Sequence, residues 1–206
     1  MNHAALRIWS ESRSIRGTPA QAYLAGRAVA TDSPQLRYNP RTPHGRRPDT
    51  RYRAAMIAAV RDESGIVAIH RTFLDSLAGG DLACRCGLGR FGGGSVRLGG
   101  AGRRLGLAEG IETALSATAL FGIPCWATLG TERFALVALS PEVEELLLFL
   151  DHDAGGRRAE ALAREAFAHL RRIETHVPER PGDDWNDVLR AARGARRPGE
   201  EEAGRG

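Results

Sequence analysis

The chain has 206 residues, of which 42 % are hydrophobic, enough for one packed α/β domain with a smaller domain beside it. No apolar run approaches the roughly 20 residues that a membrane-spanning helix needs. The polar start Met1-Asn2-His3 has no apolar signal segment, so we expect a cytoplasmic protein without a membrane partner. The net charge of +4 hides an asymmetry: residues 1–107 contain 17 arginines and 7 acidic residues, whereas residues 108–206 contain 12 and 18. This division favours a basic part that binds a polyanion and an acidic part that binds metal.

The cysteines place few constraints on the fold. Cys84, Cys86 and Cys125 are too few and unsuitably spaced for a four-ligand structural zinc site, and they imply no disulfide framework. We interpret them as ordinary small residues in a reducing compartment.

The first third of the chain predicts two short helices and an arginine-rich loop. The helices cover residues 4–11 and the segment from Pro19, with Thr18 as N-cap. Residues 37–53 are expected to form a loop, because they contain three prolines. Their arginines either bind nucleic-acid phosphates or only cover a solvated loop. The candidate phosphate-binding residues are Arg41, Arg46, Arg47 and Arg51, together with Arg71 farther along.

A β-hairpin and a glycine-rich stretch come next. Alternating apolar residues over 55–60 and 66–74 flank a turn at 62–65, which indicates two antiparallel strands. Residues 79–102 are rich in glycine, and residues 87–92 spell the dinucleotide-binding pattern G-x-G-x-x-G. That pattern must open a helix, which residues 93–99 cannot form, so we reject it and expect a connecting loop.

From residue 104 onward, strands and helices alternate. Strands are predicted over 105–108, 124–129, 145–150 and 173–177, with helices over 111–121, after Thr131, over 157–171 and over 185–192. This succession predicts a parallel sheet flanked by helices, preceded by a smaller basic α+β subdomain. We therefore expect domains over 1–103 and 104–193, and a disordered tail over 194–206, which has little apolar content.

Carboxylates follow three of the predicted parallel strands. Glu109 ends the first strand, Asp151 and Asp153 end the buried strand, and Asp184 and Asp187 follow the last. Each group alone is also typical of a turn or a helix cap. Together they should meet at the carboxyl edge of the sheet, and in an extended chain Asp151 and Asp153 would point to the same side. A cation must offset their repulsion, and oxygen ligands favour Mg²⁺, with Mn²⁺ as a substitute.

Three motifs resemble those of the Toprim domain. They are residues 107–116 (LAEGIETALS), 148–159 (LFLDHDAGGRRA) and 182–189 (GDDWNDVL). Residues 8–9, 17–24 and 70–75 are similar to the region before Toprim in phage and plasmid primases or primase-helicases.

The resemblance implies a role for each residue of the motifs. Glu109 would be the general acid/base or a metal ligand, and Asp151 and Asp153 would be Mg²⁺ ligands, with Asp184 at the third motif. The supporting residues would be Gly110, Gly156, Asn186 and Asp187, with Gly156 allowing a tight turn. One departure is Thr113, which stands where many primases have an aspartate, so a second metal ion is not implied.

The function implied by this resemblance is a DNA primase that makes RNA primers on single-stranded DNA from NTPs with Mg²⁺. The zinc ribbon and helicase that often accompany such primases are not in this sequence, which leaves three interpretations open. The chain is a split primase subunit, a remnant, or an enzyme that relies on partners such as a replicative helicase or a separate zinc-ribbon protein. Two alternatives stay open: a Toprim nuclease, which would shorten DNA without NTPs, and a non-catalytic nucleic-acid-binding module. A topoisomerase is disfavoured, because such enzymes need a nucleophilic tyrosine in a further domain. All three tyrosines of this chain lie in its basic front part.

Overall fold

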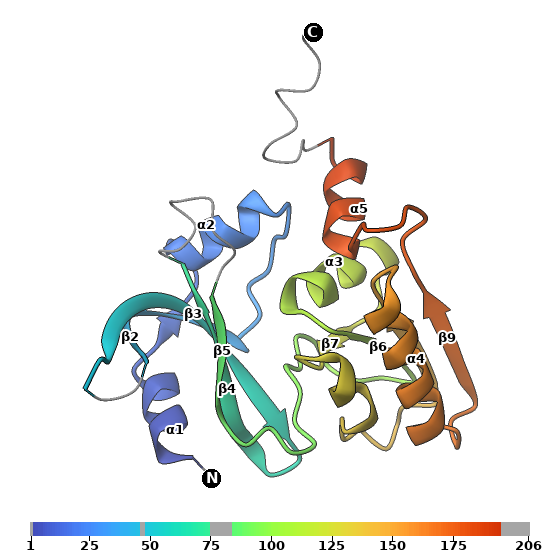
Figure 1. The fold of residues 1–206 in the computed structure, drawn as a ribbon, viewed down its shortest axis with the longest axis horizontal. Coiled ribbons are helices and arrows are strands. Elements are labelled where there is room, and N and C mark those ends of the chain that lie inside the picture. The colour runs from blue at the N-terminus through green and yellow to red at the C-terminus, as the bar shows by residue number, and fades with distance from the viewer. Residues whose placement is uncertain (1, 46–47, 75–83, 195–206) are drawn as a thin grey trace, which may run out of the picture.

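The computed structural model describes residues 2–45, 48–74 and 84–194, and it contains two β-sheets that lie side by side (Figure 1). The first sheet is antiparallel and is built from the first half of the chain. Its strands, in order of pairing, are β1 (Arg13–Ser14), β2 (Leu36–His44), β3 (Arg51–Asp62), β4 (Gly65–Phe73) and β5 (Arg85–Gly89). Helix α1 (His3–Ser10) and helix α2 (Pro19–Gly26) pack on it.

The two faces of this sheet are both covered, which explains the long apolar run in its central strand. Ala55, Ile57 and Ala59 of β3 pack with α1, whereas Met56 and Ala58 lie in the core that contains α2. Because alternate residues of a strand point to opposite faces, a strand between two helices must be apolar at every position.

The second sheet is entirely parallel, as the sequence predicted. Its strands pair in the order β7 (Cys125–Ala127), β6 (Arg104–Ala108), β8 (Glu145–Phe149) and β9 (Arg172–His176). The remaining elements are α3 (Ile111–Phe121), the 3₁₀ helix η2 (Thr131–Ala135), α4 (Ala154–Ala166) and α5 (Trp185–Ala192). The fold class predicted from the sequence, a helix-flanked parallel sheet after an α+β subdomain, is confirmed. The first subdomain is not the smaller one, because its sheet has five strands and the parallel sheet has four.

Strand alternation also builds the layers of the parallel sheet. Leu105 and Leu107 of β6 pack in the core with α4 and η2, whereas Ala108 lies in the core with α3 and α5. The sheet is thus sandwiched between α4 on one face and α3 with α5 on the other.

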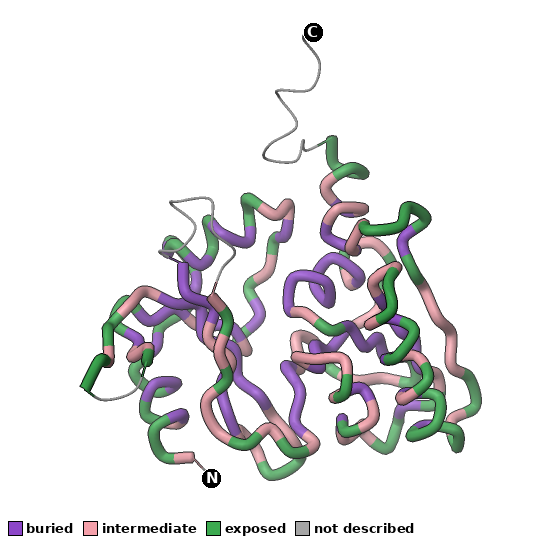
Figure 2. Tube along the Cα trace, viewed as in Figure 1, coloured by how far each residue is buried: buried purple, intermediate pink, exposed green. Residues whose placement is uncertain are grey.

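One core contains residues from both sheets, and Figure 2 shows buried stretches in each of them. Tyr23 and Leu24 of α2 belong to the same buried cluster as Ile111 of α3 and Trp185 of α5.

Within the described residues, no helix has the length and apolar character needed to cross a membrane.

Two segments predicted as loops contain strands. Residues 37–53 include most of β2 and the start of β3, and the glycine-rich stretch contains β5. Pro40 is tolerated in β2 because the pairing with β3 shifts register between Asn39 and Thr42, which is a bulge that accommodates a residue unable to donate a hydrogen bond. No helix follows residues 87–92, so the rejection of the dinucleotide-binding pattern is confirmed.

A helix was predicted over 157–171, and both of its predicted ends were wrong. Helix α4 begins at Ala154, because the Asp153 side chain caps it by accepting a hydrogen bond from Gly156 N (2.8 Å), and it ends at Ala166. The predicted tail falls almost wholly outside the described residues, which end at residue 194. The two N-terminal helices, by contrast, begin within one residue of their predicted starts.

Candidate active site

The predicted acidic edge lies where the two central parallel strands end. Glu109 directly follows β6, and Asp151 follows its neighbour β8 by two residues. The chain leaves β6 toward β7 on one side, whereas it leaves β8 toward β9 on the other. Glu109 and Asp151 therefore flank the point where the strand order reverses, which is the usual ligand site of open parallel sheets.

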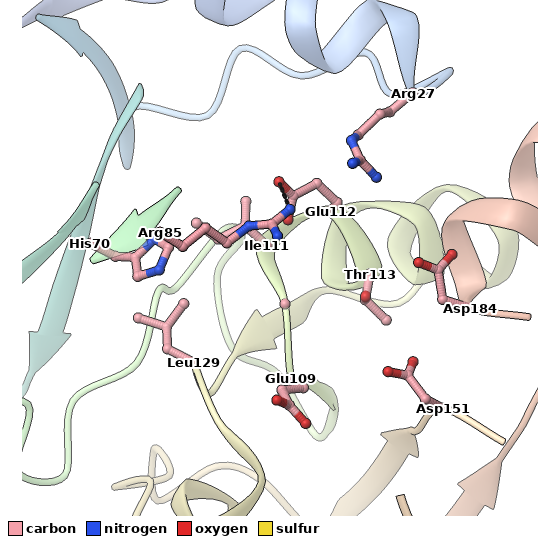
Figure 3. A pocket seen from close by; sticks show the side chains of 11 residues that line it. Arg27, His70, Arg85, Glu109, Ile111, Glu112, Thr113, Leu129, Asp151 and Asp184 are labelled. Atoms are coloured by element: carbon pink, nitrogen blue, oxygen red, sulfur yellow. Dashed lines mark hydrogen bonds and ion pairs between the residues drawn. The ribbon is translucent and has the colours of Figure 1, made fainter. Parts of the chain in front are cut away.

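A cleft of about 260 Å³ brings this edge together with the basic half of the chain. Figure 3 shows Glu109, Asp151 and Asp184 around one part of it, with Thr113 between them. Arg27 and Arg85, which come from the first half of the chain, line the rest. The cleft thus combines carboxylates that can hold a cation with guanidinium groups that can hold phosphate.

Local hydrogen bonds fix the position of two of these carboxylates. Glu109 Oε2 accepts a hydrogen bond from Thr131 Oγ1 of η2 (2.9 Å). Asp184 Oδ1 accepts from Asp187 N (2.8 Å), and Asp187 Oδ2 accepts from Asp184 N (3.3 Å), which together make a capping box at the start of α5. Asp187 therefore supports Asp184 by holding the turn that presents it.

Asp153 does not point the way that an extended chain would direct it. The chain turns directly after Asp151, whose carbonyl accepts from Asp153 N (2.9 Å), and Asp153 becomes the N-cap of α4. Asp153 is absent from the lining of the cleft, but it lies near enough to raise the pKa of Asp151. Gly156 is required by the same turn, because a Cβ there would collide with the carbonyl oxygen of Asp151.

The other two predicted supporting residues differ in what they do. Asn186 is buried and donates from Nδ2 to Arg27 O (2.7 Å) and to Ser116 Oγ (3.1 Å), so it ties α5 to the segment after α2 and to α3. It positions Arg27 and does not face the carboxylates. Gly110 precedes α3 with an ordinary φ of −100°, and a Cβ there would meet only ordinary contacts. The structure supplies no steric reason for glycine at this position.

The electrostatics of the cleft suit a cation. Partial burial, together with the neighbouring charges of Asp184, Glu109 and Asp153, raises the pKa of Asp151 from 3.8 to about 6. Repulsion of this kind is relieved when a divalent cation shares the carboxylates. The donors are all oxygens, so the group fits Mg²⁺.

The raised pKa of Asp151 makes a prediction about stability without metal. A carboxyl with a higher pKa in the folded state contributes stability below its unfolded pKa of 3.8, and this contribution is lost as the pH rises through about 6. With EDTA present, Asp151→Asn should therefore be more stable than the parent at about pH 7, by on the order of 1 kcal/mol after solvent screening. At about pH 4 the advantage should vanish. Urea unfolding of both proteins at each pH measures this, and an equal difference at both would contradict it.

The basic wall of the cleft is held by a buried acid. Glu112 Oε1 accepts hydrogen bonds from Tyr23 Oη (2.5 Å) and from Arg85 Nη2 (3.2 Å). Burial and the Glu112 charge raise the pKa of Tyr23 to about 12, which keeps the phenol protonated. Burial raises the pKa of Glu112, but Arg85 and the Tyr23 hydrogen bond outweigh it and lower the pKa overall. Glu112 is therefore an ionised link between the two halves of the chain.

The predicted site did not include Arg27, Arg85 or His70, which all line the cleft. Burial, together with Arg85 and Arg71, lowers the pKa of His70 to about 4, so the ring is neutral near pH 7. Its Nδ1 is shielded from solvent and has no hydrogen-bond partner among the described residues. Arg27 belongs to no motif, and His70 begins the stretch 70–75 that resembles the region before Toprim. Each reaches the cleft only because the two sheets pack together.

The predicted phosphate-binding arginines lie elsewhere. Arg41 and Arg51 are exposed, on β2 and at the start of β3, and neither lines the cleft. Arg71 donates to three backbone carbonyls, those of Pro43, Cys86 and Gly87, at 2.7 to 3.4 Å. Arg46 and Arg47 lie outside the described residues.

Two family models match the chain, one in each half. Residues 104–195 match the model of the Toprim domain, which identifies this part of the chain as a Toprim domain. Residues 1–98 match a model described as Domain of unknown function (DUF7146). No curated protein sequence matches the chain.

Among solved structures, the chain is similar to catalytic domains of DNA primases. A DNA primase domain from Pseudomonas aeruginosa is 17 % identical with a TM-score of 0.62, and the alignment covers 91 % of this chain and 73 % of that one. The DnaG catalytic core is 16 % identical with a TM-score of 0.67, covering 91 % and 74 %. The primase fragment of the bacteriophage T7 primase-helicase is 20 % identical with a TM-score of 0.50, covering 68 % and 58 %. At these identities the similarity concerns the fold.

Proposed function

We propose that this chain is the catalytic part of a DNA primase that joins NTPs into RNA primers on single-stranded DNA. One observation carries the proposal: a single cleft places Glu109, Asp151 and Asp184 opposite Arg27 and Arg85. An NTP with its bound cation needs both kinds of group, carboxylates for the metal and guanidinium groups for the phosphates. The fold similarity to primase domains supports the same activity.

The acidic residues would hold the metal. Asp151 and Asp184 face the cleft, and Asp153 adds negative charge beside Asp151. Mg²⁺ bound there would neutralise charge on the NTP phosphates and lower the pKa of the attacking 3′-hydroxyl. Thr113 lines the same part of the cleft and is neutral, so this side of the site carries one carboxylate fewer than in primases with an aspartate there.

The reaction would form one bond and break another at the α-phosphorus of an NTP. The 3′-hydroxyl oxygen of the growing primer bonds to that phosphorus while pyrophosphate leaves. Glu109, held by Thr131, would accept the hydroxyl proton or help to hold the metal. Arg27 and Arg85 would bind the phosphate oxygens.

The template would occupy the antiparallel part of the chain. We propose residues 1–103 as the template-binding domain and residues 104–193 as the catalytic domain. Arg41 and Arg51, on the hairpin of β2 and β3, would contact template phosphates, together with Arg46, Arg47 and Arg71. We also propose that the protein comes from a mobile element and that it works with a helicase or a separate zinc-ribbon protein.

Primer synthesis on single-stranded DNA tests this function. The protein is incubated with the DNA, labelled NTPs and Mg²⁺, and the products are separated by length. Oligonucleotides that require both NTPs and Mg²⁺ are the expected result. Shortening of the DNA without NTPs would identify a nuclease, and DNA binding with neither activity would identify a non-catalytic module.

Arg27→Ala should weaken NTP binding without removing the acidic site. Loss of one charge-assisted hydrogen bond to phosphate corresponds to about a tenfold to hundredfold rise in the KM for NTP. Steady-state primer synthesis at varied NTP measures it. The matched control is Arg171→Ala, which should leave that KM unchanged, because this exposed arginine does not line the cleft. Equal KM values for Arg27→Ala and the parent would contradict the assignment.

A further inference from the structure

A cluster of soft ligands lies apart from the acidic cleft. It consists of His44, at the end of β2, and two residues of one segment, Cys84 and Cys86. One donor atom from each of the three lies within 4.8 Å of the other two, and all three side chains are half-buried. None of the three lines the cleft.

The two separations that involve Cys84 are those of ligands around one tetrahedral metal ion. Cys84 Sγ lies 3.8 Å from Cys86 Sγ and 3.5 Å from His44 Nε2. With zinc bonds of about 2.3 Å to sulfur and about 2.0 Å to nitrogen, a tetrahedron has S···S edges of about 3.8 Å and S···N edges of about 3.5 Å. The two separations match these edges, whereas a disulfide would require about 2.05 Å between the sulfurs.

The fold builds this cluster from segments that are 40 residues apart. Cys86 lies in the edge strand β5, and Cys84 directly precedes it, where Phe73 N continues the pairing by donating to Cys84 O (2.9 Å). The two cysteines are two positions apart in this extended segment, so their side chains lie on the same face. The bulge in β2 lets the end of β2 bend over β4. There Arg71 Nη1 donates a hydrogen bond to Pro43 O (2.7 Å). The His44 ring then packs on Phe73, with ring centroids 4.7 Å apart.

We propose that His44, Cys84 and Cys86 bind a zinc ion, with the fourth position open to water. Two thiolates balance the charge of Zn²⁺, and thiolate with imidazole is the ligand set that selects zinc over Mg²⁺. The ion would join the end of β2 to the edge strand β5, across the face of β4.

One contact must change when the ion binds. Arg53 Nη1 lies 3.4 Å from His44 Nδ1, an arrangement in which Nδ1 accepts a hydrogen bond. Metal on Nε2 places the proton on Nδ1, so the Arg53 guanidinium must turn to another acceptor. The separation is at the long end of the hydrogen-bond range, so little is lost.

The proposal differs from the sequence-based interpretation of Cys84 and Cys86 as ordinary small residues. The spacing of Cys84 and Cys86 alone could not reveal the site, because its third ligand comes from β2. Cys125 behaves as predicted: it is fully buried in the core, away from the cluster.

Cobalt substitution tests the proposal on the whole chain. The reduced protein is treated with a chelator, desalted and titrated with Co²⁺, with Mg²⁺ present to occupy the acidic cleft. We expect one Co²⁺ per chain with the near-ultraviolet band of thiolate-to-cobalt charge transfer, displaced by one equivalent of Zn²⁺. Bound Zn²⁺ should also protect Cys84 and Cys86 from alkylation. Absence of both the band and the protection would overturn the proposal, whatever the variants do.

Variants locate the site. Cys86→Ser and His44→Ala should each weaken Co²⁺ binding by at least about 100-fold, since loss of even an outer-shell partner costs about 10- to 100-fold. Cys125→Ala, which removes a thiol outside the cluster, and Asp151→Asn, which alters the acidic cleft, should keep the band at the parent's affinity. A band that survives Cys86→Ser, or that is lost in Asp151→Asn, would place the metal elsewhere and refute the assignment.

Discussion

Asp151→Asn should lower the kcat/KM of primer synthesis by at least about 100-fold, since outer-shell changes around a metal already cost about 10- to 100-fold. Asp151 lies at the acidic edge, and burial together with the charges of Asp184, Glu109 and Asp153 raises its pKa to about 6. The amide keeps the shape of the side chain but removes the charge that binds Mg²⁺. Primer synthesis and Mg²⁺ titration of parent and variant measure the two effects together.

The control for this variant is a carboxylate outside the cleft. Glu165→Gln changes an exposed residue of α4 by the same charge and should leave activity unchanged. Asp153→Asn adds a sharper test, because Asn caps helices as well as Asp. Any loss in Asp153→Asn therefore reports on its charge and not on the start of α4. Wild-type activity in Asp151→Asn would exclude Asp151 as a metal ligand.

Glu109→Gln should abolish turnover while binding of single-stranded DNA persists. Removing a general base or a metal ligand costs about 100-fold or more in rate, since general acid–base catalysis alone contributes about 10² to 10⁴. The variant leaves every arginine of the antiparallel part unchanged, so its DNA affinity should equal that of the parent. Primer synthesis and fluorescence anisotropy with labelled DNA, on the same preparation, separate the two properties.

A second substitution distinguishes the charge of Glu109 from its position. Thr131→Val removes the hydroxyl that donates to Glu109 Oε2 but keeps the carboxylate. We expect a loss of about tenfold, smaller than for Glu109→Gln, because the carboxylate is only less well oriented. If Glu109→Gln keeps parental turnover, Glu109 has no catalytic role and the non-catalytic module becomes the better explanation.

Local patterns were enough to predict the parallel sheet and the position of its carboxylates. Helices α3 and α5 have the predicted bounds, because apolar periodicity and capping residues act over a few neighbours. The convergence of Glu109, Asp151 and Asp184 on one cleft also follows from a local rule, since all parallel strands end at the same edge.

Local rules failed where a neighbouring element decided the conformation. Three prolines indicated a loop over 37–53, but pairing with β3 and a bulge hold most of this segment in a strand. Asp153 was expected to point with Asp151, but the chain turns at once into α4 and makes Asp153 a cap. In both cases the local sequence favoured one conformation, and hydrogen bonds to other residues stabilised a different one.

The sequence by itself determined the elements and the acidic edge, because these depend on periodicity, caps and strand direction. Only the tertiary structure brought Arg27 and Arg85 to that edge, through the core shared by the two sheets and the bonds of Glu112 and Asn186. Only the bend of β2 brought His44 to Cys84 and Cys86. The physical reason is the same for both: contacts between residues far apart in the chain depend on how whole sheets twist and pack, which no short segment specifies.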